Sequence, residues 1–131
     1  MSSPERLNIS SGSYLEPIIG FSRAVRIGSH IAVGGTAPIA AGGGTAAIGD
    51  VYGQTMRCFE IIAKALTDAG GSLADVTRTR ILVTDIAYWK EAARAHGEVF
   101  GAIRPVTTTM AVGGFVDPDW LVEIEVDAIV G

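Results

Sequence analysis

The chain has 131 residues, of which 48% are apolar and 18% charged, and its formal net charge is −4. This composition excludes intrinsic disorder, and the length is that of one domain, so we predict a single domain over residues 1–131. Acids outnumber bases, and the sequence contains no basic stripe. We therefore expect neither nucleic acid nor an anionic membrane surface as a partner.

Few side chains are available for metal binding through sulfur or nitrogen: one cysteine, Cys58, and two histidines, His30 and His96. A single cysteine cannot form an internal disulfide, and this spacing matches no familiar metal site, so we expect no metal ion. The first six residues lack the basic and apolar runs of a secretory signal. Residues 27–49 are uncharged but contain seven glycines and a proline. We expect a cytoplasmic protein without a membrane span.

The first half of the chain predicts three strands followed by a helix. Gly28-Ser29 is typical of the turn of a two-residue hairpin. Asp50 is a good N-cap and Gly70-Gly71 a good C-cap for a helix whose apolar residues recur at helical spacing. The expected elements are strands over 6–9, 21–27 and 30–33, a glycine-rich loop over 40–49 and a helix over 51–69.

The second half predicts one more helix between strands. The expected elements are a strand over 76–83, a helix over 87–100 capped by Asp85, and strands over 107–112 and 121–130. Because side chains alternate along a strand, Arg78 and Arg80 are expected on one side and Thr77, Thr79 and Ile81 on the other.

The last strand is the most informative for architecture. Apolar residues from Val122 to Val130 occupy one face, and Glu123, Glu125 and Asp127 occupy the other. One face of the sheet is therefore covered by helices and the other is polar. About six strands with two helices packed on one face indicate an α+β domain.

Several common catalytic motifs are absent from the sequence. The glycine-rich loop lacks the spacing of a phosphate-binding loop or of a dinucleotide site, and no GxSxG or HExxH motif occurs. Cys58 is expected to be a small buried residue of the first helix, and His96 a solvent-facing residue of the second.

The acid row of the last strand allows two interpretations. It is either the solvated face of an exposed strand, or it shares a polar face with Arg23 or Arg26 and with Arg78 or Arg80. Opposite charges on neighbouring strands could then line a cleft or pair across a subunit boundary.

Five segments, in order and with characteristic spacing, resemble the RidA/YjgF family of reactive-intermediate deaminases over about residues 18–131. They are Val25-Arg26-Ile27-Gly28, Gly35-Thr36-Ala37-Pro38, Thr79-Arg80-Ile81-Leu82-Val83-Thr84-Asp85, Arg104-Pro105-Val106-Thr107 and Val122-Glu123-Ile124-Glu125-Val126-Asp127-Ala128-Ile129-Val130. The resemblance implies a chorismate-mutase-like fold and a homotrimer with clefts between subunits. It also implies hydrolysis of enamines or imines such as 2-aminoacrylate to a 2-keto acid and ammonia, without a metal or organic cofactor.

The resemblance assigns three residues to one part of the site. Glu123 matches a glutamate that orients the attacking water. Phe21 stands at a position that is usually tyrosine, so the ring is kept and the hydroxyl is lost. Gly34 stands where serine is common.

The family's arginine, which holds the substrate carboxylate two residues after the proline, is replaced by Thr107. A hydroxyl cannot replace a bidentate guanidinium on a carboxylate. Thr107 and Thr109 alternate onto one side of their strand, so we expect hydroxyls in the pocket. Arg104 is the candidate replacement cation.

Three functions remain open. The first is a trimer whose cleft binds a small polar metabolite and hydrolyses an enamine or imine other than 2-aminoacrylate through a water oriented by Glu123. The second is a full imine deaminase that has recruited another cation. The third is a non-catalytic binding or chaperone-like trimer in which Glu123 only pairs across the interface. Ribonuclease activity, named for some members, is disfavoured by the net charge.

Overall fold

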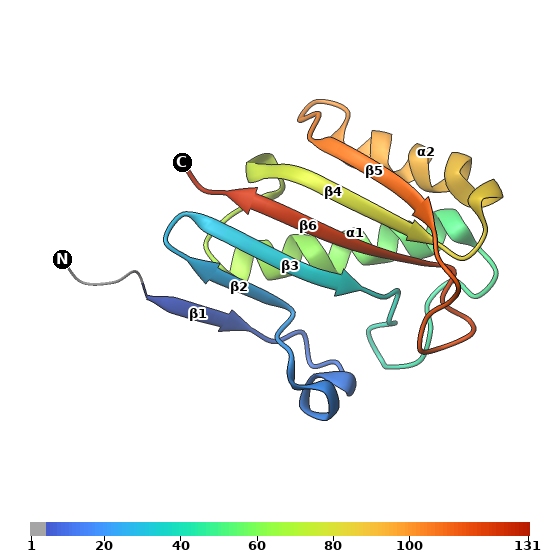
Figure 1. Ribbon diagram of the computed structural model, residues 1–131, viewed down its shortest axis with the longest axis horizontal. Helices are drawn as coiled ribbons and strands as arrows, with labels where there is room; N and C mark the ends of the chain where they lie inside the picture. The colour runs from blue at the N-terminus through green and yellow to red at the C-terminus, as the bar shows by residue number, and fades with distance from the viewer. Residues whose placement is uncertain (1–4) are drawn as a thin grey trace.

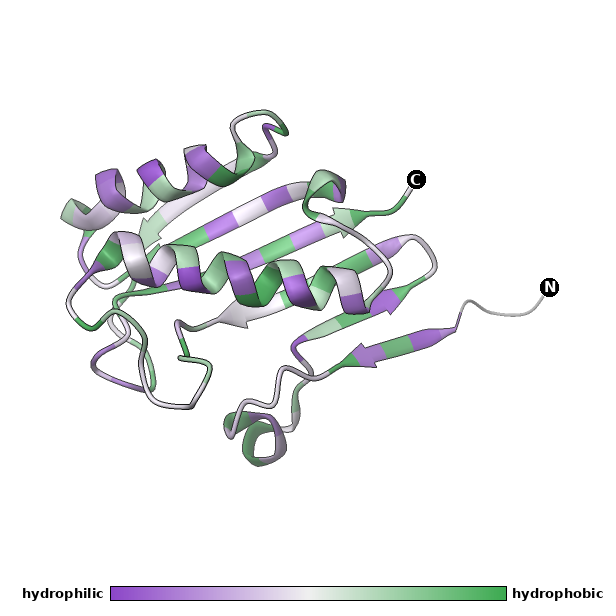
Figure 2. Cartoon of the chain, turned by 180° about the vertical axis from the view of Figure 1, so that it is seen from behind, coloured by the Kyte–Doolittle hydropathy of each residue, from purple (hydrophilic) through white to green (hydrophobic). Residues whose placement is uncertain are grey.

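A single six-stranded sheet carries both helices on one face. The computed structural model describes residues 5–131, and its strands lie in the order β1-β2-β3-β6-β4-β5. All neighbouring strands are antiparallel except β4 and β5. Figure 1 shows the helices behind the sheet, and Figure 2 shows them in front from the opposite side. This confirms the predicted α+β architecture with a mixed sheet.

The elements follow the predicted order with small shifts at their ends. They are β1 (Arg6–Ile9), η1 (Glu16–Gly20), β2 (Ala24–Ile27), β3 (His30–Thr36), α1 (Val51–Asp68), η2 (Leu73–Asp75), β4 (Val76–Val83), η3 (Ile86–Tyr88), α2 (Trp89–Phe100), β5 (Val106–Ala111) and β6 (Val122–Ile129). Asp85 caps η3 rather than α2, because its carboxylate accepts a hydrogen bond from Ala87 N at 2.9 Å. No helix of the described residues is long and apolar enough to cross a membrane.

Helix α1 begins and ends at the predicted caps. The Asp50 carboxylate accepts a hydrogen bond from Gly53 N at 3.1 Å. At the other end Gly70 has φ +84°, and Gly71 N donates to Leu66 O at 2.8 Å, so glycine allows the left-handed turn that closes the helix. The face between these caps is buried against the sheet, with Ile62 and Leu66 fully inaccessible.

Strand β6 supplies the centre of the core. Val122, Ile124, Val126 and Ala128 are buried on the side of the helices, which confirms the predicted alternation. Glu123, Glu125 and Asp127 are half-buried on the opposite side. We call that side the helix-free face of the sheet.

A bulge at the start of β4 corrects one prediction. Val76 pairs with Ala128 and Arg78 with Asp127, so β4 holds one residue more than β6 between these pairs. Thr77 is the extra residue: it is exposed, whereas Val76 and Thr79 are both buried. The prediction that Thr77 shares a side with Thr79 is wrong, because a bulge shifts the alternation by one residue.

Replacing Ile62 by alanine tests the core. Ile62 is fully buried at the α1–sheet contact, so Ile62→Ala is expected to lower the free energy of unfolding by about 2–5 kcal/mol. Ile48→Ala removes the same atoms from a side chain that is 66% exposed and is expected to cost no more than about 0.5 kcal/mol. Urea denaturation followed by circular dichroism measures both, and equal losses would contradict this assignment of the core.

Candidate functional site

A second bulge, in β3, contains a glycine that makes room for the Glu123 side chain. Val33 pairs with Val126 and Thr36 with Ile124, so Gly34 and Gly35 occupy a stretch that is one residue longer than its partner in β6. A Cβ atom added at Gly35 would come within 2.8 Å of Glu123 Oε1. A side chain at position 35 would therefore compete with the carboxylate for the same space.

The Glu123 carboxylate faces a cavity of about 350 Å³ next to this bulge, which we call the Glu123 cleft. Three residues assigned by the resemblance, Phe21, Gly34 and Glu123, line it together. Its remaining walls are mainly apolar. They include Leu15, Ile19, Val116 and Trp120. The cleft thus combines a carboxylate with an enclosing apolar surface.

Glu123 is electrostatically distinct from the other acids of its row. Burial raises the pKa of Glu123 above its usual range, Glu125 raises it further, and Arg23 partly opposes the shift. Within residues 5–131 Glu123 forms no ion pair, whereas Asp127 lies 3.8 Å from both Arg78 and Arg80. A half-buried carboxylate with a raised pKa is suited to accept and return a proton near neutral pH.

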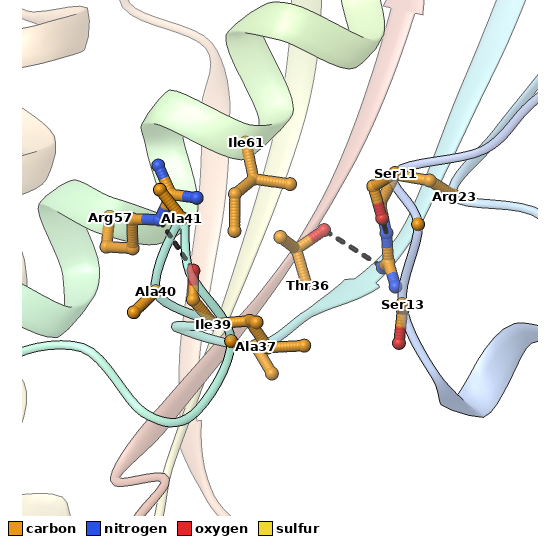
Figure 3. Close-up of a pocket in the computed structure, with 12 residues that line it drawn as sticks. Ser11, Ser13, Arg23, Thr36, Ala37, Ile39, Ala40, Ala41, Arg57 and Ile61 are labelled. Atoms are coloured by element: carbon orange, nitrogen blue, oxygen red, sulfur yellow. Dashed lines mark hydrogen bonds between the residues drawn. The ribbon is translucent and has the colours of Figure 1, made fainter.

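Arg23 is the basic residue that belongs to this cleft, and it is only 4% exposed. Its Nη1 donates hydrogen bonds to Gly35 O at 2.6 Å and to Thr36 Oγ1 at 3.2 Å, and its Nε donates to Ser11 Oγ at 3.2 Å. Figure 3 draws a second cavity that Arg23 also lines, and it shows the side chain held between the Ser11 and Thr36 hydroxyls, with Ser13 beyond its end. Its guanidinium carbon lies 5.2 Å from the centroid of the Phe21 ring.

Arg26, the alternative considered from the sequence, lies on the other face. Its Nη1 donates to Ala69 O at the end of α1 at 2.9 Å, so it ties β2 to that helix. The arginines on the helix-free face of the central strands are Arg78 and Arg80, and both are near Asp127. Of the two alternatives, Arg23 is thus the one beside Glu123.

Thr107 and Thr109 do not line the Glu123 cleft of the same chain. Thr107 pairs with Thr79 and Thr109 with Ile81, and Thr79 and Ile81 face the helices. The Thr79 hydroxyl donates to Thr107 Oγ1 at 2.7 Å. Both predicted threonines are exposed on the edge strand β5, which β4 separates from β6. A single chain therefore presents the predicted site residues as two groups on opposite faces.

Arg104 belongs to the second group. It lines a cavity of about 360 Å³ with His96, Phe100 and Pro105, at the end of α2. Its φ is +59°, which is uncommon for a residue with a side chain. This places the predicted replacement cation away from Glu123 within one chain.

His96 is half-buried and packed rather than fully solvent-facing, which corrects that prediction. Its Nε2 lies 2.8 Å from Thr79 Oγ1, and its ring packs against Phe59 and Phe100, with centroids 5.9 and 4.9 Å away. Burial lowers the pKa of His96, so the imidazole is neutral at pH 7. The spacing of Ala92, His96 and Phe100 along one helix face is the pattern that indicates this burial.

Cys58 is buried as predicted. Burial raises the pKa of its thiol, which makes the reactive thiolate unavailable at neutral pH. Among the described residues no group of three or more histidines, cysteines and acids is placed to hold a metal ion.

Comparison with known proteins identifies the family. Residues 12–130 match the family model described as endoribonuclease L-PSP, and the chain belongs to this family, which is also named RidA/YjgF/YER057c/UK114. The crystal structure of a YjgF/YER057c/UK114 family member from Mycobacterium tuberculosis is similar, with a TM-score of 0.87 and 45% identity, over 96% of this chain and 100% of that one.

Two relatives illustrate the sequence similarity. An uncharacterized protein of Streptomyces coelicolor is 37% identical over 131 residues, which cover 100% of this chain and 97% of that protein. The 3-aminoacrylate deaminase RutC of Acinetobacter baylyi is 32% identical over 108 residues, covering 82% of this chain and 85% of that protein.

The raised pKa of Glu123 predicts a pH-dependent effect of Glu123→Gln. The folded chain holds this proton more tightly than the unfolded chain, so stability falls as the pH rises from the usual glutamate range through the raised pKa. At pH 7 Glu123→Gln is therefore expected to increase the free energy of unfolding by about 1 kcal/mol, and the difference should shrink towards pH 4.

Urea unfolding between pH 4 and pH 8 measures this difference. Glu60→Gln, which alters an exposed acid on α1 paired with Arg57, serves as the matched control and should show no such trend. If Glu123→Gln is instead less stable than the wild type at pH 7, the carboxylate has a partner. That result would support the interpretation in which Glu123 pairs across a subunit boundary.

Gly35→Ala tests whether the bulge positions Glu123. The added Cβ would meet the end of a flexible side chain, so we expect the carboxylate to move and the free energy of unfolding to change by no more than about 1 kcal/mol. The pKa of Glu123, followed by carbon-detected NMR, should change. Gly34→Ala, where the nearest atoms are 3.9 Å away, should leave that pKa unaltered. The same pKa in all three proteins would contradict this role of Gly35.

Proposed function

We propose that this protein binds a small metabolite with an apolar substituent in the Glu123 cleft and hydrolyses an enamine or imine there. The observation that carries the proposal is the half-buried Glu123 carboxylate, which has a raised pKa, no ion-pair partner among residues 5–131 and a mainly apolar cavity beside it. The name of the relative RutC, a 3-aminoacrylate deaminase, supports deamination as the type of reaction.

Glu123 can carry the protons that this reaction requires. Its carboxylate accepts a proton from water while the water oxygen bonds to the imine carbon and the C=N electron pair moves to nitrogen. Glu123 returns the proton to nitrogen, which gives a carbinolamine. Glu123 then takes the proton of the carbinolamine hydroxyl and gives it to nitrogen while the C–N bond breaks. The products are ammonia and a carbonyl compound, so one water is consumed for each imine.

We further propose that a second copy of the chain completes the cleft. Thr107 and Thr109 lie on the exposed edge strand β5, on the opposite face from Glu123, so both groups can reach one ligand only if they come from different copies. A trimer with clefts between subunits, as the family resemblance implies, provides this arrangement. The ligand would then meet hydroxyls from the neighbouring copy.

The mainly apolar walls of the cleft favour a larger substituent than that of 2-aminoacrylate. With Thr107 in place of an arginine, a ligand carboxylate has to be held by another cation. The net charge of −4 argues against ribonuclease activity, which requires phosphate neutralisation.

The test compares ammonia and keto-acid release from two substrates generated in situ: 2-aminoacrylate, and the imine of leucine formed by an amino-acid oxidase. We expect the protein to accelerate hydrolysis of the leucine imine, and Glu123→Gln to slow it about 100-fold or more. Glu60→Gln is the control that removes an exposed acid. Thr107→Arg is expected to gain activity on 2-aminoacrylate.

Each outcome bears on the proposal. Hydrolysis of 2-aminoacrylate by the wild-type protein as fast as that of the leucine imine would contradict the preference for an apolar substituent. If neither substrate is hydrolysed by the wild type or by Thr107→Arg, the catalytic proposal fails and a binding function replaces it. Light scattering on the same samples measures the oligomeric state, and a monomer would contradict the composite cleft.

A further inference from the structure

Arg23 is a buried cation whose hydrogen bonds all go to neutral groups. Its acceptors are the Ser11 and Thr36 hydroxyls and the carbonyl oxygens of Gly34 and Gly35. In the part of the chain that the structure describes, no carboxylate lies within 4 Å of its guanidinium. A buried charge is costly unless a counter-charge accompanies it, so Arg23 is suited to receive an anion.

Part of the guanidinium is also available for a ligand. The hydrogen bonds of Arg23 use Nε and Nη1, which leaves the two N–H groups of Nη2 without a partner among the described residues. The free end of the side chain is directed towards Ser13 (Figure 3), and these two residues line both the cavity drawn there and the Glu123 cleft. A charge-assisted hydrogen bond from Nη2 to a carboxylate oxygen is the strongest contact this group can make.

The acidic residues near Arg23 do not occupy the position that a ligand carboxylate would take. Burial lowers the pKa of Arg23 below its usual range, and Glu16 and Glu123, which act at longer range, partly oppose this shift. The Glu16 carboxylate is already bound, because it accepts hydrogen bonds from Ser11 N at 3.1 Å and Ser13 N at 2.9 Å. Glu123 is needed elsewhere if it activates water. Neither acid neutralises the guanidinium directly.

We infer that Arg23 takes the place of the arginine absent at position 107 and binds the carboxylate of the ligand in the Glu123 cleft. The ligand class is then a 2-imino or 2-oxo acid whose apolar side chain is enclosed by Leu15, Ile19, Val116 and Trp120. The reactive carbon, adjacent to the carboxylate, lies towards Glu123. The inference rests on the proposed function for the reaction, but the binding it assigns to Arg23 requires no turnover.

Binding of 4-methyl-2-oxopentanoate, a 2-oxo acid with a branched apolar side chain, tests the inference. Trp120 lines the cleft, and the other tryptophan, Trp89, lies on α2 and is half exposed. In the Trp89→Phe background, Trp120 fluorescence therefore reports on the cleft. We expect a saturable change, and an affinity that Arg23→Gln lowers at least 10-fold. Arg94→Gln, which alters an exposed arginine on α2, is the matched control and should leave the affinity unchanged.

Two further measurements keep the test valid if Arg23→Gln does not fold. The uncharged amide 4-methyl-2-oxopentanamide should bind the Trp89→Phe protein at least 10-fold more weakly than the acid, since only the charge and the oxygen acceptor differ. Glu123→Gln should bind the acid several-fold more tightly, because a like charge near the carboxylate is removed.

The results separate this inference from the proposed function. Three results would each overturn the role of Arg23. The first is equal affinity for the acid and the amide, and the second is absence of binding. The third is binding that is lost in Arg104→Gln but retained in Arg23→Gln. If the acid binds through Arg23 but no imine is hydrolysed, the carboxylate site stands and the proposed catalysis fails. If the leucine imine is hydrolysed equally by the wild type and Arg23→Gln, the catalysis stands and the role of Arg23 is wrong.

Discussion

The hydrogen bonds between the Arg23 guanidinium and the β3 bulge hold together the part of the molecule that matters most for its chemistry. One extra residue in β3 turns the carbonyl groups of Gly34 and Gly35 towards Arg23, and the guanidinium compensates for ladder bonds that the bulge removes. Within this bulge the absence of a side chain at Gly35 leaves space above β6, where the Glu123 carboxylate lies. A local irregularity of the sheet thereby creates the polar end of the cleft.

Glu123 and Asp127 show how one row of acids serves two purposes. Asp127 is near Arg78 and Arg80, and its charge helps to join the central strands on the helix-free face. Glu123 has no such partner in the described chain, and burial makes its charged form unfavourable. A protein keeps such a group at a cost in stability where function requires it, which is why the two acids are interpreted differently.

The separation of the predicted site residues into two groups follows from the topology of the sheet. β4 lies between β6 and β5, and the side chains of Thr107 and Thr109 point to the helix side while Glu123 points to the other. Thr107 is also hydrogen-bonded to Thr79, which in turn meets the neutral imidazole of His96. The edge of β5 therefore presents hydroxyl groups rather than a cation, and the positive charge beside Glu123 comes from Arg23.

The sequence alone determined the elements and their general arrangement. Alternation along β6, helical spacing in α1 and the caps at Asp50 and Gly70 are local patterns, and each reports which face of an element is apolar. The short motifs from Val25 to Val130 also identified the family and pointed to Phe21, Gly34 and Glu123, which the structure brings into one cleft.

Only the tertiary structure decided which side chains meet across strands. The exposure of Thr77 and the position of Arg23 beside Glu123 depend on register and on two bulges, in β3 and β4. A bulge changes the face of every residue beyond it by inserting one residue, and local sequence patterns scarcely record where it falls. The pairing of strands distant in the chain supplies that information, because hydrogen bonds between β3, β6 and β4 fix the register.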